Sequence, residues 1–381
     1  MTRKLGLLFL LISFITPKVF SYNQLPPKTY AQQTLVRHIE HLHIGRVHEY
    51  KNLKFFTIES SHRIRTNGTR YVTLDEATDK GWLEIEEISY SGSVGTVRIK
   101  NNGTKNVFIM KGEIIVGAKQ NRMATRSVLI PPCDTWFDVP VNCVERRRWS
   151  NTSAGFTSGK TLVPNSVRQK STETASQGAV WREISKVQNE CRVQSGTQNV
   201  VDVYKDKNIE QQINDYVRHF SYVPHEKEAT IGIIVTTGDR IICVDTFANN
   251  KLLTKLWPKL IRSYAMDALH SKRSTVRKTD AFHFMEAMKR KWPSIYEELA
   301  VEGVRNAHLS LTNTKGKGSA LVMLPPHYID IAPEVVHMDF FPKSKSDQNP
   351  FLWDMGIPEP IFRRGPVLES ITIERRRESR R

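Results

Sequence analysis

The sequence predicts a mixed α+β fold, in which an N-terminal, antiparallel, β-rich and sandwich-like lobe is followed by helices and a smaller antiparallel strand group. Three observations predict this fold. Short segments of strand-like apolar pattern, separated by Gly, Asn and Pro, fill residues 53–144. Apolar residues then recur at helical spacing, most strongly over residues 251–270. Strand-like segments return from residue 307 onward.

The elements of the first lobe follow in order. A short helix is expected over residues 30–42, and the period then changes to that of strands. Turn residues bound each of the expected strands. These strands are residues 53–59, 70–74, 83–89, 96–101, 106–116, 124–130 and 135–144.

The second half begins with a change of composition. Ser, Thr, Gly and Gln dominate residues 151–177, which predicts a long exposed loop. Beyond it, Gly238-Asp239 predicts a hairpin between residues 231–236 and 240–245. Helices are expected over residues 177–191, 208–219, 251–270 and 281–290, and the last strands over residues 307–312, 319–323 and 335–340.

The domain organisation follows from the ends of the chain. A basic start, an apolar core and Val19-Phe20-Ser21 are typical of a secretory signal peptide over residues 1–21, so we expect a secreted, extracellular protein. No later stretch is long and apolar enough to span a membrane. The remaining parts are an N-terminal extension (22–41), one α+β domain (42–342, β-rich over 50–145 and helical or mixed over 175–342) and a Pro-rich basic tail (343–381).

The composition is that of a soluble globular protein with an excess of positive charge. The 381 residues are 39% hydrophobic and carry a formal charge of +17. These values exclude a disordered, collagen-like or multi-pass membrane protein. The charge indicates an anionic partner, either a small ligand or an extracellular polyanion. We expect no nucleic-acid partner, because no RNA-binding, zinc-finger or zipper motif accompanies the basic runs.

A secreted protein can form disulfides and carry N-linked glycans, so its cysteines and glycosylation sequons are candidates for both. The four cysteines, Cys133, Cys143, Cys191 and Cys243, could form one or two disulfides, but the sequence does not choose between the pairings. Asn67, Asn102 and Asn151 each begin a glycosylation sequon, although about three would arise by chance.

A polar run follows a short apolar strand and contains the first candidate site residues. The guanidinium of Arg122 could form two parallel hydrogen bonds with a carboxylate or phosphate, and the ammonium of Lys119 would add a second positive charge. The alternative interpretation is a polar β-turn. The candidates in this stretch are Glu113, Lys119, Gln120, Asn121 and Arg122.

The helix over residues 251–270 supplies the rest of the expected pocket. Leu252, Leu253, Leu256, Leu260, Tyr264 and Ala268 recur at helical spacing and should face the core. Lys251, Lys255, Lys259 and Arg262 should project from other sides, and Trp257 should be an exception because Pro258 disturbs the helix. Trp257, Lys259 and Arg262 are predicted to join the polar run in one ligand-binding pocket, because both segments belong to the parts of the chain that carry the family resemblance described below.

Other motifs are weaker. Cys143 with Glu145 could be a thiol beside a base, or a packed or disulfide-bonded cysteine. The histidines at 38, 41, 43 and 48 lack accompanying ligands, and we expect neither a metal nor a cofactor. Residues 154–161 match a permissive P-loop, but Pro164 should prevent the helix that such a loop requires.

Several segments carry a resemblance to a known family, and they are residues 71–77 with Gly81, 112–113, 117–122, 141–145, 149–150, 256–268 and 335–337. Together these segments resemble the ARG and rhodanese-phosphatase-superfamily-associated protein domain family. The resemblance covers roughly residues 42–342, and it implies a single α+β unit. The family name records gene association with ADP-ribosylglycohydrolases and rhodanese-like phosphatases, which implies a nucleotide-derived ligand and no particular chemistry.

Two functions from different classes follow. The first is a secreted protein that binds, and in one form of the hypothesis hydrolyses, a small anionic ligand of the nucleotide or ADP-ribose type. The second is a non-catalytic secreted protein that binds extracellular matrix or another polyanion. The first requires a concave pocket, whereas the second requires positive charge spread over an open face. The sequence identifies no catalytic residue.

Overall fold

The structure, a computed structural model, describes residues 29–61, 71–88, 95–290, 294–298, 306–313, 315–324 and 332–343. Within these ranges it confirms the mixed α+β class, with its strands in three sheets. No helix in the described part of the chain is both long enough and apolar enough to cross a membrane. The predicted signal peptide, Asn67 and nearly all of the predicted tail lie outside the described residues.

The largest sheet has eight strands and combines the first and last strands described. Their order across the sheet is β1-β2-β12-β13-β17-β16-β15-β14, so the strand group predicted after residue 307 joins this sheet. All of its neighbouring pairs are antiparallel. The strands are β1 (Leu42–Tyr50), β2 (Leu53–Ser60), β12 (Thr230–Thr237), β13 (Arg240–Phe247), β14 (Ser294–Glu298), β15 (Asn306–Asn313), β16 (Gly316–Met323) and β17 (Glu334–Pro342).

Two smaller sheets contain the other strands. One has the order β11-β7-β8-β10-β5-β4, and the other has the order β3-β6-β9. In the second, β3 and β6 run parallel. The strands are β3 (Tyr71–Thr73), β4 (Leu83–Glu87), β5 (Thr96–Asn101), β6 (Asn106–Ile109), β7 (Glu113–Gly117), β8 (Arg122–Ala124), β9 (Val128–Ile130), β10 (Cys133–Cys143) and β11 (Phe156–Leu162).

Several of the helices begin at side-chain caps. Thr29 and Gln32 form a capping box at the start of α1, and Thr73 with Glu76 does the same for the short α2. The Asn249 side chain accepts the Leu252 backbone N–H at 2.9 Å and so caps α7. The helices are α1 (Tyr30–Glu40), α2 (Leu74–Asp79), α3 (Asn165–Glu173), α4 (Gln177–Glu190), α5 (Val201–Lys205), α6 (Lys207–Phe220), α7 (Asn250–Leu269) and α8 (Lys278–Arg290), with a 3₁₀ turn at Val223–His225.

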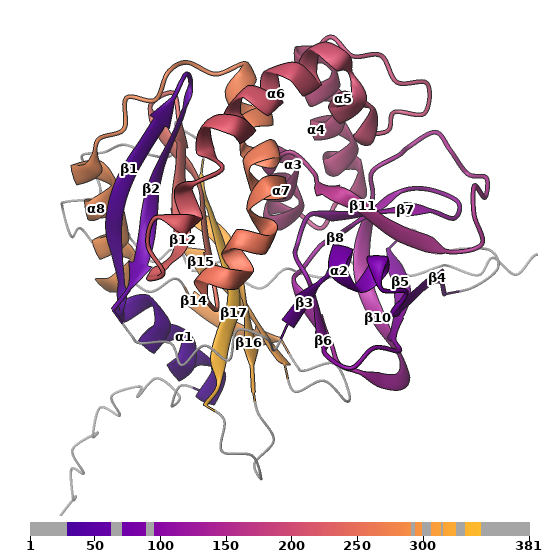
Figure 1. The fold of residues 1–381 in the computed structure, drawn as a ribbon, viewed down its shortest axis with the longest axis horizontal. Helices are drawn as coiled ribbons and strands as arrows, with labels where there is room; N and C mark the ends of the chain where they lie inside the picture. Colours follow the sequence, from indigo (N-terminus) through magenta and orange to yellow (C-terminus); the bar gives the residue numbers. More distant parts are fainter. Residues whose placement is uncertain are drawn as a thin grey trace, which may run out of the picture.

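The large sheet is covered on both faces. Phe55 and Phe56 are neighbours on β2, and they point to opposite faces as strand geometry requires. Phe56 packs in the cluster that contains α1 and α8, whereas Phe55 packs in the cluster that contains α6 and α7. Figure 1 shows α7 between the large sheet and the strands of the smaller sheets. The two faces of the large sheet therefore belong to different cores.

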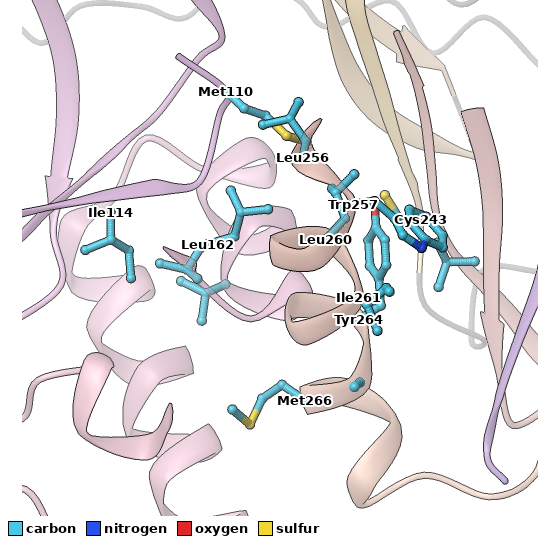
Figure 2. Packing of buried hydrophobic residues seen from close by; sticks show 14 of the residues in the cluster. Met110, Ile114, Leu162, Cys243, Leu256, Trp257, Leu260, Ile261, Tyr264 and Met266 are labelled. Atoms are coloured by element: carbon cyan, nitrogen blue, oxygen red, sulfur yellow. The ribbon is translucent and has the colours of Figure 1, made fainter. Parts of the chain in front are cut away.

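Helix α7 is the centre of the larger core. Its Leu252, Leu253, Leu256, Leu260, Tyr264 and Ala268 are at most 3% exposed, which confirms the predicted apolar face. Figure 2 shows Met110, Ile114 and Leu162 on one side of this helix and Cys243 on the other.

Two predictions about this helix were wrong. Trp257 lies in the core, where its ring is 5.4 Å from that of Phe55. Lys259 is buried as well, because acidic partners from other elements reach it.

Two predicted strands are each divided in two. Residues 106–116 contain β6 and β7, because Gly112 adopts a φ of +89° and the chain turns there into another sheet. Residues 124–130 contain the last residue of β8 and the whole of β9. The prediction also missed β1, an edge strand with an irregular register between Ile44 and Val47.

The prediction of an exposed loop over residues 151–177 was wrong. This stretch contains the whole of β11 and of α3, and Leu162, Val163 and Val167 are fully buried. Its polar composition concealed this because Asn165 and Arg168 are also fully buried, and their partners come from distant parts of the chain. The helix begins only after Pro164, which agrees with our rejection of a P-loop.

Candidate functional site

A cleft of about 480 Å³ lies between the large sheet and the smaller sheets. One wall is formed by residues 308–310 of β15 and 318–321 of β16. Residues 125–127 and residues 140–142 of β10 form the other, and α3 contributes Ser171 and Thr172. The volume lies within the range of roughly 300 to 1,000 Å³ that is usual for small-molecule sites.

The lining of this cleft is positively charged and rich in hydroxyl groups. Its cations are Lys111 and Arg126, and no Asp or Glu is among the described lining residues. His308 lies in the same wall and is 8% exposed. Burial, together with the charge of Arg126, lowers the pKa of His308 to about 4, so this imidazole is neutral at pH 7. The hydroxyl groups belong to Thr125, Ser127, Ser171, Thr172, Ser310 and Ser319.

Buried ionisable side chains of the large sheet contact this lining. Asp245 on β13 and Asp339 on β17 are directly opposite each other in the register. His337 precedes Asp339 by two residues and therefore lies on the same face of β17. All three side chains are at most 1% exposed. A charged row this deep in the fold requires partners.

Asp339 is held by residues that line the cleft. The Lys111 ammonium lies 3.2 Å from its Oδ1 and 3.1 Å from its Oδ2. The Ser319 N–H and hydroxyl donate to Oδ1 at 2.8 and 2.9 Å, and Lys111 also donates to the Ser319 hydroxyl at 3.0 Å. Asp339 therefore fixes the position of Lys111 at the cleft.

Asp245 is the most heavily hydrogen-bonded carboxylate of the row. Arg168 of α3 grips it with both terminal nitrogens, at 3.0 and 2.7 Å. The Tyr264 hydroxyl and the Cys243 thiol also donate to it. Burial favours a higher pKa for Asp245, but the Arg168 guanidinium and the His337 hydrogen bond hold that pKa well below its usual range. Asp245 is therefore an ionised acceptor.

A hydrogen-bonded chain connects Asp245 to the cleft. His337 Nε2 lies 3.2 Å from Asp245 Oδ1, and His337 Nδ1 lies 2.8 Å from the Ser127 hydroxyl oxygen. An ionised carboxylate only accepts, so Nε2 of His337 donates to Asp245. When the ring carries only this proton, Nδ1 is an acceptor for the Ser127 hydroxyl. The Lys111 backbone N–H donates in turn to the Ser127 oxygen at 3.0 Å.

Gly112 provides space for Arg168 to reach Asp245. A Cβ atom at position 112 would lie 2.7 Å from Cγ of Arg168, and the φ of +89° also disfavours any other residue there. The guanidinium lies over the Phe341 ring, 5.3 Å from its centre. The helix α3, the turn at Gly112 and the strand β13 thus meet at one buried cation.

The same row contains the one set of possible metal ligands found among the described residues. Single ligand atoms of Asp245, His337 and Asp339 lie within 4.8 Å of one another. Arg168 and Lys111 already supply two positive charges to the two carboxylates. A divalent cation would compete with both, so we assign no metal ligands here. The histidines at 38, 41 and 48 have other partners, namely Thr246, Arg37 and Tyr222.

Two of the predicted ligand-binding residues, Glu113 and Lys259, form a direct ion pair, although they are far apart in the sequence. Asp75 adds a second carboxylate 2.9 Å from the Lys259 ammonium. Burial favours a lower pKa for Lys259, but the charges of Glu113 and Asp75 outweigh it and raise that pKa. Lys259 is therefore a buried, charged residue that ties α7 to β7 and α2.

The polar run after β7 forms a second group. Arg122 is fully buried, donates to Gln120 at 2.8 Å and lies over the Trp149 ring, which Lys119 also approaches. The Asn121 N–H donates to Glu145 at 3.2 Å. The group is thus a folded cluster around Trp149 and Glu145.

The remaining predicted residues have partners elsewhere. Trp257 donates its indole N–H to the Phe220 carbonyl at 2.8 Å, and Arg262 donates to Asn214 at 3.0 Å. None of the eight predicted ligand-binding residues is among those that line the cleft.

The thiol of Cys143 donates to the Glu145 carbonyl at 3.3 Å, and burial raises its pKa. It is therefore a thiol at neutral pH, and no described cysteine forms a disulfide. Asn102 and Asn151 are both exposed.

Sequence reasoning missed Lys111, Arg126, Ser127, Arg168, Asp245, His308, His337 and Asp339 as site residues. One signal was present in the last strand and in β13. The apolar runs Ile241-Ile-Cys-Val-Asp245 and Val335-Val-His-Met-Asp339 each contain charged or titratable residues in a segment that must be buried. Buried ionisable groups are retained only with partners, so such residues mark a site or a structural network.

The model of the ARG and Rhodanese-Phosphatase-superfamily-associated Protein domain matches residues 41–341, which contain the cleft and the buried row. No curated protein and no solved structure matches the chain.

Proposed function

The chain belongs to the ARG and Rhodanese-Phosphatase-superfamily-associated Protein domain family, and on that basis we propose that its cleft binds a small anionic ligand of the nucleotide or ADP-ribose type. The observation that carries this proposal is the lining, which holds Lys111 and Arg126 and no described carboxylate. The gene association that the family name records favours the same ligand class.

The charges and hydroxyl groups suit two parts of such a ligand. Arg126 can grip a phosphate with two nitrogens, and Lys111 is fixed beside the cleft by Asp339. The hydroxyls of Thr125 and Ser310 and the amide of Asn142 can exchange hydrogen bonds with sugar hydroxyls. A hydroxyl-rich cation site favours a phosphorylated sugar over a purely apolar compound.

Calorimetric titration of the purified protein with ADP-ribose, AMP and inorganic phosphate tests this proposal. Arg126→Ala should weaken binding by ~1.5 to 3 kcal/mol, the range for a hydrogen bond that involves charge. Arg126→Lys should restore the affinity only in part, because an ammonium cannot form the two parallel hydrogen bonds of a guanidinium. Arg240→Ala is the matched control, since Arg240 is an exposed arginine at the start of β13 and is not part of the lining.

Equal affinities in wild type, Arg126→Ala and Arg240→Ala would contradict binding in this cleft. Circular dichroism of each variant separates a lost contact from a lost fold.

The alternative function, a secreted matrix or polyanion-binding protein, rests on another surface. Arg146 and Arg147 are exposed beside Trp149, which is itself exposed. Heparin binding that falls steeply with salt, and that is lost in an Arg146→Ala/Arg147→Ala double variant but kept in Arg126→Ala, would favour this function.

Secretion is a separate proposal, supported by the pattern of residues 1–21. Protein recovered from the medium should begin at Tyr22 and carry glycans at the exposed Asn102 or Asn151. An intact Met1 on the recovered protein would contradict it.

A further inference from the structure

Ser127 combines two properties in the described part of the chain. Its side chain lines the cleft, although it is only 4% exposed, and its hydroxyl oxygen lies 2.8 Å from Nδ1 of a histidine whose Nε2 is hydrogen-bonded to an ionised aspartate. These three groups come from the turn before β9, from β17 and from β13. The arrangement matches the roles of a nucleophile, a general base and the acid that orients the base, with the two ring nitrogens exchanged relative to serine proteases.

We propose that Ser127 is a nucleophile that hydrolyses a carboxylic ester of an anionic compound bound in the cleft, with His337 as the general base. This inference rests on the proposed function, because the cleft has to admit the anionic part of the ester. It goes further by assigning a reaction and the residues that touch the reacting atoms.

The first half of the reaction forms an acyl-enzyme. The Ser127 oxygen attacks the carbonyl carbon while its proton moves to His337 Nδ1, which gives a tetrahedral oxyanion. When this intermediate collapses, the bond from the carbonyl carbon to the alcohol oxygen breaks. The leaving alcohol takes the proton from His337, and the acyl group remains on Ser127.

Water completes the reaction. It attacks the acyl carbon, gives one proton to His337 and displaces the Ser127 oxygen, which recovers that proton. The products are a free carboxylic acid and a regenerated hydroxyl, so no oxidant or other co-reactant is needed. Asp245 keeps the proton on Nε2 throughout, which leaves Nδ1 available as the base.

The surroundings of Ser127 favour a catalytic role over a purely structural role for its hydrogen bonds. The Lys111 N–H fixes the Ser127 oxygen at 3.0 Å, and the Lys111 ammonium belongs to the same cleft. Arg126, the residue before Ser127, adds a second positive charge to the lining. Positive groups in a partly enclosed site stabilise a developing oxyanion.

The test uses the full chain and two small esters, neutral 4-nitrophenyl acetate and the anionic mono-4-nitrophenyl succinate. Release of 4-nitrophenolate reports turnover, and mass spectrometry of quenched protein locates the acyl group. We expect an adduct of the acyl mass on the peptide that contains Ser127, and a higher kcat/KM for the anionic ester. Arg126→Ala should lower kcat/KM for both esters, because Arg126 belongs to the lining, and the loss should be larger for the anionic ester, so that most of the preference disappears.

Ser127→Ala should abolish the adduct, and Ser127→Ala and His337→Gln should each lower turnover at least about 100-fold, which is the low end of general acid–base effects. Ser221→Ala is the matched control, because Ser221 is an exposed serine at the end of α6 outside the cleft. Ser127→Cys provides a variant that keeps a nucleophile of similar size in case the alanine variant does not fold.

Failure of the reaction and failure of binding give different results. An adduct on another residue, or no adduct and no turnover from wild-type protein that still binds ADP-ribose, would overturn the nucleophile and leave the proposed function standing. Unchanged turnover in His337→Gln would overturn the role of the base. If Arg126→Ala leaves binding of every anionic ligand unchanged, the proposed function fails instead.

Discussion

Asp245 and Asp339 face each other across β13 and β17, and each carboxylate is paired with a cation from a different layer of the molecule. Arg168 comes from α3, and Lys111 comes from the turn between β6 and β7. Two carboxylates this close repel each other unless both are compensated. The pairing therefore joins the large sheet to the remainder of the fold through four buried charges.

Arg168→Met should destabilise the protein by about 3 to 5 kcal/mol, the usual cost of removing one partner from a buried ion pair. The cost arises because Asp245 would remain buried and without its cation. Urea unfolding followed by circular dichroism measures it. Lys170→Met on the same helix removes a half-exposed lysine paired with Glu173, and it should cost less than about 1 kcal/mol. Equal costs for the two variants would show that the buried pair is not important for stability.

His308 should make the protein less stable in mild acid. Its pKa is about 4 in the folded protein against 6.5 for the free side chain, since burial and Arg126 oppose its protonation. As the pH falls from 6.5 toward 4, the unfolded chain binds a proton that the folded protein does not. The free energy of unfolding should then drop by up to about 3 kcal/mol.

The measurement for His308 is urea unfolding at pH 7.5 and pH 4.5 for wild type and His308→Gln. The variant should lose less stability over this interval, and the difference isolates His308 from other titrating groups. His219→Gln, at an exposed histidine of α6, should behave like wild type. A His308→Gln variant as acid-sensitive as wild type would contradict the prediction.

Leu260→Ala should cost about 2 to 5 kcal/mol, because Leu260 is fully buried in the core that surrounds α7 and its truncation leaves a cavity. Lys251→Ala changes an exposed residue of the same helix and should cost less than about 0.5 kcal/mol. Denaturant unfolding of both variants checks the orientation of the helix. A cost for Leu260→Ala below that of the lysine control would mean that the helix packs differently.

Gly112→Ala should be destabilised by more than about 1 kcal/mol, from the positive φ alone. The clash with Arg168 should add to that cost and also disturb the bond to Asp245. Gly196→Ala provides the control, since an added Cβ there meets nothing within 4 Å. Thermal melts of the two variants should differ clearly, and a Gly112→Ala melt at the wild-type temperature would be inconsistent with this account.

Regular periodicity made much of the fold predictable. The apolar spacing in α7 and the turn residues Gly238-Asp239 identified a helix and a hairpin within one or two residues of their observed bounds. These signals are local, because each depends on residues within one element. The helix α2 also had a local signal, since Thr73 and Glu76 have capping-box spacing, yet the prediction extended the strand into its first residue.

The cleft could not be predicted in the same way. Arg168 lies 77 residues from Asp245, and its segment has the composition of an exposed loop. Nothing local distinguishes an arginine that solvates a surface from one that compensates a buried carboxylate. The sequence predicted that Glu113 and Lys259 would line the same ligand-binding pocket. The two residues do lie together, but they form an ion pair with each other.

The distance between Ser127 and His337 along the chain also matters for how the protein is made. The two residues are separated by 210 positions, so Ser127 leaves the ribosome long before its partner exists. After β13 has been synthesised and before β17 exists, the edge of β13 that later pairs with β17 has no strand beside it. Contacts of such long range slow folding, because the chain must lose much of its freedom before they form. The cleft and the last sheet pairing should therefore form together as a late event, and a nascent chain that stops before β17 would have Ser127 without His337 and an open strand edge.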